Sequence, residues 1–199
     1  MYRCILIFIL LFPCRLPAQE KPVFGEVKAD KLFKCTEYAE RDAVYATCNP
    51  VENICNSKYE LEIRLHYYSM PHGGEGLIIV TYGNNKWDAR MYKYERASLG
   101  YQLQYTIAKP EFNNMYNYSF SLVFDTLKSN HIFLLPSQAE LPVKGWVSDG
   151  VGYAITFKAG DQFRTYYFNN PKSYMQMNEN LPELKQYETI VRNLFNLFN

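Results

Sequence analysis

The chain has 199 residues, a formal net charge of +1, 48% hydrophobic residues and 21% charged residues. This length and composition predict one globular domain and argue against wholesale disorder. The net charge is small and no basic stripe is present to hold phosphates, so we expect no nucleic-acid partner.

Aromatic residues are frequent, with 18 Tyr and 13 Phe in an aromatic share of 17%. Such side chains favour pleated surfaces, which predicts a β-rich domain with tyrosines along its strands. The alternative is an exposed aromatic surface that stacks on a ligand such as a sugar ring. The sequence leaves both interpretations open.

Residues 1–18 have the three parts of a secretory signal peptide. Arg3 gives a positive start, residues 5–12 form an apolar run, and Ala18 precedes the expected cut before Gln19. The apolar run is too short to span a bilayer, which takes about 20 residues. We therefore predict export to the periplasm or the extracellular space, with residues 19–199 forming a single β-rich domain.

A second interpretation of the leader is a bacterial lipoprotein signal with lipid anchoring at Cys14. Leu11 and Cys14 fit that pattern, but Phe12 and Pro13 stand where small residues are expected. We therefore favour removal of a signal peptide over lipid anchoring. Removal of the leader, with its two arginines, changes the formal net charge from +1 to about −1.

Three cysteines follow the leader, at Cys35, Cys48 and Cys55. In an oxidising compartment two of them are expected to pair, although the sequence does not decide which two. Cys48 and Cys55 flank a short loop in which Asn49 and Pro50 favour a turn, so a Cys48–Cys55 bridge is the candidate. It would contribute about 2 to 3 kcal/mol by restricting the unfolded chain. No nucleophile motif or zinc-type spacing surrounds these cysteines, so we assign them no catalytic or metal role.

From residue 58 onward, the sequence predicts successive strands joined by short polar turns. Leu61 and Ile63 alternate with Glu62 and Arg64, a pattern typical of a strand with one wet face. Short connections imply antiparallel neighbours, because parallel strands need long crossovers. The predicted strands, about eight in all, cover residues 61–67, 77–82, 87–94, 101–107, 118–124, 132–135, 151–157 and 163–168.

The loop at residues 69–76 contains His72, Gly73 and Gly74, a sequence found in the oxyanion-hole loops of some esterases. No Gly-x-Ser-x-Gly elbow accompanies it, so we interpret it as a glycine-rich hairpin loop and keep His72 as a candidate ligand contact. His66, His72 and His131 are too scattered to indicate a metal site. We therefore assign no catalytic residue, no metal and no cofactor.

A secreted hydrolase remains an alternative, since exported proteins with paired carboxylates can cleave glycosides. The separation of two carboxyl groups decides that chemistry, and sequence does not give it. The acidic residues concerned are Asp88, Glu95, Asp125, Asp149 and Asp161.

The sequence of the last third of the chain predicts a hairpin followed by a helix. Gly160 and Asp161 separate the last two predicted strands, which is typical of a hairpin turn. In the second of these strands, Arg164, Tyr166 and Phe168 share one face. Either that face is buried, partly by the helix, or it is an exposed stacking platform, and we keep the three residues as a candidate ligand surface.

The predicted helix covers residues 182–198, where apolar residues recur at three- and four-residue steps. Such an amphipathic helix needs a hydrophobic surface to cover, and the sheet beside it supplies one.

These last residues also carry a resemblance. The chain resembles the C-terminal ends of uncharacterised exported bacterial proteins that have a Tyr-rich hairpin and a closing helix, over roughly 50 of its 199 residues. The resemblance implies secretion and a β-rich fold, and it implies no activity or site residue. The segments that carry it are Asp149-Gly150, Gly160-Asp161, Arg164-Thr165-Tyr166, Asn169-Asn170-Pro171 and Pro182-Glu183.

Together these patterns predict an α+β fold: a curved antiparallel sheet of about seven or eight strands with a C-terminal amphipathic helix packed on one face. For function, we predict a non-catalytic exported domain that binds a protein partner or a cell-envelope component. The alternatives are binding of a glycan or small ligand through exposed aromatic side chains, and a secreted hydrolase.

Overall fold

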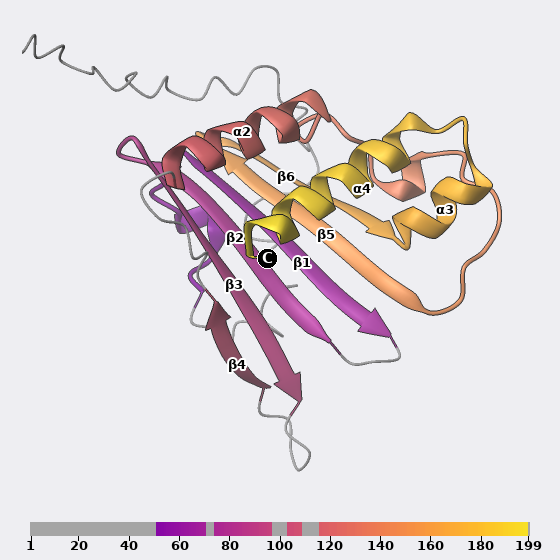
Figure 1. The fold of residues 1–199 in the computed structure, drawn as a ribbon, viewed down its shortest axis with the longest axis horizontal. Coiled ribbons are helices and arrows are strands. Elements are labelled where there is room, and N and C mark those ends of the chain that lie inside the picture. Colours follow the sequence, from indigo (N-terminus) through magenta and orange to yellow (C-terminus); the bar gives the residue numbers. More distant parts are fainter. Residues whose placement is uncertain (1–50, 71–73, 97–102, 109–115, 199) are drawn as a thin grey trace, which may run out of the picture.

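A computed structural model describes residues 51–70, 74–96, 103–108 and 116–198. In these residues the fold is α+β, with an open antiparallel sheet of six strands and helices on one of its faces (Figure 1). The strands are β1 (Leu61–Met70), β2 (Glu75–Gly83), β3 (Lys86–Arg96), β4 (Leu103–Ala108), β5 (Gly150–Ala159) and β6 (Gln162–Asn169).

The strand order is β4-β3-β2-β1-β5-β6, with every neighbouring pair antiparallel. The chain runs outward from the central β1 to β4, and it returns to the other side of β1 after helix α2 (Tyr116–Ser129). Tight turns join β2 to β3 and β5 to β6. Asn84 and Asn85 have φ of 52° and 58° between β2 and β3, and Gly160 has φ of 58° between β5 and β6. These left-handed conformations suit Asn and Gly. They confirm the hairpin turn predicted at Gly160 and the short polar turn expected between strands 77–82 and 87–94.

Helix α2 occupies the residues for which a strand at 118–124 was predicted, and that prediction is wrong. The apolar residues there also fit a helical spacing, because Phe120, Phe124 and Leu127 follow one another at steps of four and three. All three are buried. Leu122, which a strand would place on one face with Phe120 and Phe124, is 60% exposed. Trp87 of β3 packs beneath the helix, with its ring centroid 5.1 Å from that of Phe124.

Residues 132–135 form turns instead of the predicted strand. Their carbonyl groups receive side-chain donors from β6: Tyr166 Oη donates to Ile132 O at 2.9 Å, and Arg164 Nη2 donates to Leu135 O at 2.6 Å. With this segment and α2 outside the sheet, the described residues form six strands, and the predicted count of seven or eight is not matched.

The C-terminal helix is present. Helix α4 (Pro182–Phe195) continues into the 3₁₀ turn η3 (Asn196–Phe198), which together match the predicted span. Its buried stripe faces the sheet, where each fully buried aliphatic or aromatic side chain contributes about 1.5 to 3 kcal/mol. The stripe comprises Leu184, Tyr187, Ile190, Val191 and Leu194.

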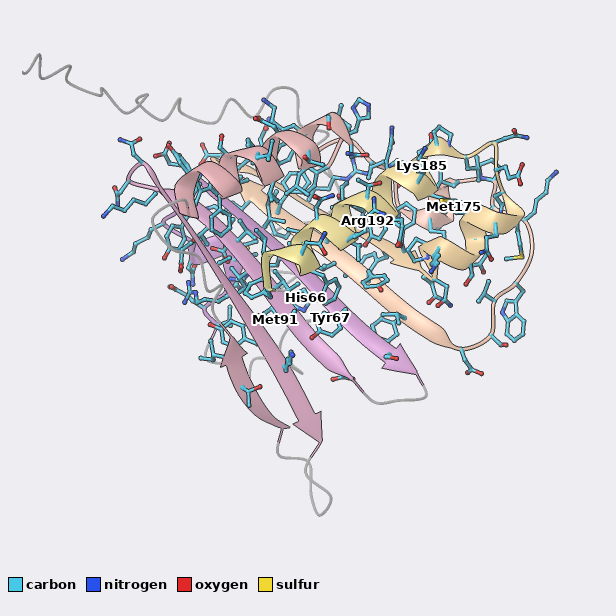
Figure 2. All side chains as sticks on the ribbon, viewed as in Figure 1. His66, Tyr67, Met91, Met175, Lys185 and Arg192 are labelled. Atoms are coloured by element: carbon cyan, nitrogen blue, oxygen red, sulfur yellow. The ribbon has the colours of Figure 1, made fainter. Side chains whose placement is uncertain are left out.

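Aromatic contacts join α4 to the strands below it. The Tyr187 ring stacks on Phe168 of β6 at a centroid distance of 3.9 Å. Tyr67 of β1 meets Phe195 near the end of the helix at 5.0 Å, and side chains fill the layer between the helices and the sheet (Figure 2). A further short helix, α3 (Pro171–Met177), was not predicted. None of the helices in the described ranges is long and apolar enough to cross a membrane.

Candidate functional site

The structure places the three predicted surface residues of β6 in the core. Arg164, Tyr166 and Phe168 are 1%, 0% and 2% exposed, because this face of β6 packs under α4 and the turns at residues 132–135. Burial also raises the pKa of the Tyr166 hydroxyl. These side chains therefore do not form an exposed stacking platform, and of the two interpretations of the strand the structure supports burial.

The other predicted site residues are described only in part. His72 and Cys48 lie outside the described residues. Cys55 lies half-buried in the 3₁₀ turn η1 (Ile54–Asn56), where the Asn53 side chain accepts a hydrogen bond from its backbone N–H. The Cys48–Cys55 bridge stays a prediction.

The face of the sheet opposite the helices differs most from expectation. Glu62 and Arg64 were predicted on a wet face of β1, yet they are only 4% and 3% exposed. Two buried charges are stable only when they are paired and hydrogen-bonded, and these are. Arg64 Nη2 lies 2.6 Å from Glu62 Oε1, and Arg64 Nε donates to the same oxygen at 2.7 Å.

The segment of residues 51–59 lies against this face and is held there by polar contacts, and we call it the strap. Arg64 Nη2 donates to the carbonyl of Glu52 at 2.6 Å. Ser57 Oγ donates to the second carboxylate oxygen of Glu62, and Lys158 Nζ of β5 donates to the Ser57 carbonyl at 2.5 Å. Glu62 and Arg64 thus neutralise each other's charge, and each also forms a hydrogen bond that holds the strap against the sheet.

The strand register places a second arginine in the same row. Arg64 pairs with Ile79 across β1 and β2, and Ile79 pairs with Arg90 across β2 and β3. Two strand spacings separate the arginines, about 10 Å between their Cα atoms. Arg90 Nε lies 3.4 Å from Asp88 Oδ2, so each arginine has its carboxylate two residues earlier on its own strand.

A cleft of about 330 Å³ lies between the strap and these strands. Its sheet side is formed by β1, β2 and β3, and its other side by residues 51–53 and 57–59. Tyr59, 40% exposed, lines it from the strap. The sheet residues that line the cleft are Glu62, Arg64, Ile79, Arg90 and Tyr92.

The charges around the cleft balance. Glu52 and Glu62 oppose Arg64 and Lys58, and Asp88 lies beside Arg90. Arg90 Nε is buried and, among the described residues, has no hydrogen-bond acceptor within good geometry.

Two further features bear on chemistry. Burial, together with the nearby Arg64 charge, lowers the pKa of His66 from 6.5 to about 4, so this imidazole is neutral at physiological pH. The described ranges contain no group of three or more His, Cys, Asp or Glu side chains placed to hold a metal ion. No protein-family model matches the chain, and the search of curated proteins gives no match.

Sequence reasoning missed the cleft because it expected Glu62 and Arg64 to be solvated. The signal available was a repeated pattern, an acid and an arginine two residues apart on one strand face, in Glu62-x-Arg64 and Asp88-x-Arg90. The covering strap could not be inferred from that pattern.

Proposed function

We propose that the protein is a non-catalytic exported domain that binds a cell-envelope component through the sheet face opposite the helices. Export is inferred from residues 1–18 as a signal peptide, with residues 19–199 as one domain. The observation that carries the proposal is the cleft beside Arg64, Arg90 and Tyr59, because clefts with a few fixed polar groups and an aromatic wall are typical of binding sites.

The binding role is favoured over catalysis by how the acidic groups are held. Both carboxylate oxygens of Glu62 are occupied, one by Arg64 and the other by the Ser57 hydroxyl. A general acid or base has to exchange a proton with its substrate, which a carboxylate engaged in this way does poorly. The same contacts make the cleft a preorganised surface, which lowers the entropic cost of binding.

The helix side of the sheet is a poorer candidate. Its strand residues and the stripe of α4 form one continuous hydrophobic core, so little of that face is available to a ligand. Leu122 is an exposed apolar side chain on α2, and one such side chain is normal for a protein surface.

Co-sedimentation with fractionated envelope material tests the proposal. The purified chain from residue 19 is mixed separately with cell-wall polysaccharide, membranes and solubilised envelope proteins. A Tyr59→Ala, Arg90→Gln double variant should lose binding to one fraction, whereas the control Leu122→Ala, on the exposed side of α2, should keep it. Absence of binding to every fraction, or equal loss in both variants, would contradict the proposal.

A further inference from the structure

Resting on the function proposed above, we infer that the cleft between the strap and strands β1 to β3 binds a small neutral saccharide of one or two rings. Size is the first constraint. A volume of about 330 Å³ lies at the lower end of the range of about 300 to 1,000 Å³ for small-molecule sites, so the ligand is compact.

Charge is the second constraint. Arg64 is already neutralised by Glu62 at 2.6 Å, and Arg90 lies 3.4 Å from Asp88. An anionic ligand would have to compete with these carboxylates and would meet their repulsion, whereas a neutral ligand leaves both pairs intact. A charge-balanced cleft therefore favours an uncharged polar molecule.

The hydrogen-bonding groups of the cleft narrow the chemical class of the ligand further. Arg90 and Lys58 line the cleft with cationic groups, which can only donate. Glu52 lines the same cleft, and its carboxylate can only accept. A hydroxyl group donates and accepts at once, so a molecule with several hydroxyls satisfies such a mixed lining better than a ligand with donors alone or acceptors alone.

Tyr59 supplies the apolar contact. Its ring lies against the backbone of Gly83, where an added Cβ would come within 3.1 Å of Tyr59 Cδ1. This contact restrains one side of the ring, while 40% of the residue stays exposed to solvent. Tyr59 also lines the cleft. An aromatic ring held in this way offers its face to the apolar C–H side of a sugar while the hydroxyls reach the charged pairs.

A ligand titration monitored by saturation-transfer NMR tests this inference. The chain from residue 19 is titrated with cellobiose and N,N′-diacetylchitobiose as neutral probes and with digalacturonic acid as an anionic probe. At least one neutral probe should bind saturably and more tightly than the anionic one. Tyr59→Ala should weaken that binding by about three- to ten-fold, and Tyr59→Phe, which keeps the ring, should restore most of it.

The matched control is Tyr167→Ala. Tyr167 is also 40% exposed and lies on the same sheet face, opposite Ala154, but it does not line the cleft. Its variant should bind like the wild type. Equal weakening in the Tyr59 and Tyr167 variants, tighter binding of digalacturonic acid, or no saturable binding of either neutral probe would overturn the inference. If envelope binding still depended on Tyr59 and Arg90 in that last case, the proposed function would stand without a saccharide ligand.

Discussion

Breaking the buried ion pair from one side should destabilise the protein far more than replacing both partners. In Arg64→Met, the Glu62 carboxylate keeps the Ser57 hydroxyl but loses its guanidinium partner at 5% side-chain exposure. Leaving one buried charge without its partner costs about 3 to 5 kcal/mol. Lys158 is the cross-strand neighbour of Glu62 and relieves part of that cost, so we expect a value near the lower end, about 3 kcal/mol.

The double variant Glu62→Leu, Arg64→Met removes both charges and leaves two apolar side chains of similar size in a buried site. Such replacements are often neutral or stabilising, so the free energy of unfolding should return to within about 1 kcal/mol of the wild type. The control is Arg90→Met, whose pair with Asp88 has 32% and 47% of its side-chain surfaces exposed. An exposed pair of that kind contributes about 0 to 1 kcal/mol.

Urea unfolding of the wild type and these three variants, followed by circular dichroism and fluorescence, measures the four free energies. A cost below about 1 kcal/mol for Arg64→Met would mean that the pair is solvated and that the strap does not enclose it. A double variant that is less stable than Arg64→Met would refute the reasoning in another way, because it would show that the pair stabilises the fold more than two apolar side chains do.

Three further predictions concern single side chains. Tyr187→Phe should leave the melting temperature unchanged or raise it, because the buried Tyr187 hydroxyl has no hydrogen-bond partner among the described residues; a clear fall would reveal a partner. The pKa of His66 is lowered from 6.5 to about 4, so between these pH values the unfolded chain binds a proton more readily than the folded protein. The free energy of unfolding should therefore be highest above about pH 6.5 and fall by about 3 kcal/mol as the pH drops to about 4. His66→Gln should flatten that part of a pH series of urea melts, and an unchanged slope would contradict the assignment. Gly150→Ala should cost at least about 1 to 3 kcal/mol in the same assay, because Gly150 has φ of 139° and an added Cβ would lie 1.7 Å from Asn170 Oδ1; a neutral result would show that the turn rearranges.

The sequence predicted the strands and the helix where one periodicity was clear. Residues 61–67 alternate strictly, and residues 182–198 follow a helical spacing, and both became the expected elements. At residues 118–124 the apolar side chains fit both periods. The contact of Phe120 and Phe124 with Trp87 belongs to the helical alternative, and this tertiary contact is invisible in a local pattern.

The candidate site was less predictable from the sequence than the strands and the helix, because it depends on which faces of the sheet other segments of the chain cover. An alternating strand with Glu62 and Arg64 on one side is usually half-solvated, and only the strap turns that side into a buried pair beside a cleft. On β6 the sequence allowed either burial or exposure of the face that carries Arg164, and the structure shows burial. Arg164 was kept as a candidate ligand contact, but its guanidinium is inside the fold and donates to a carbonyl of the neighbouring turn.

Hydroxyl-radical footprinting of the bound and free protein tests most directly whether the sheet face opposite the helices is the binding surface. Mass spectrometry reports the oxidation of each exposed side chain with and without the envelope fraction that binds. Tyr59 at the cleft should be protected on binding, while Leu122 on α2 and Trp146, 81% exposed in the loop before β5, should be oxidised equally in both samples. Protection of Leu122 or Trp146 with no change at Tyr59 would place the binding surface elsewhere on the molecule.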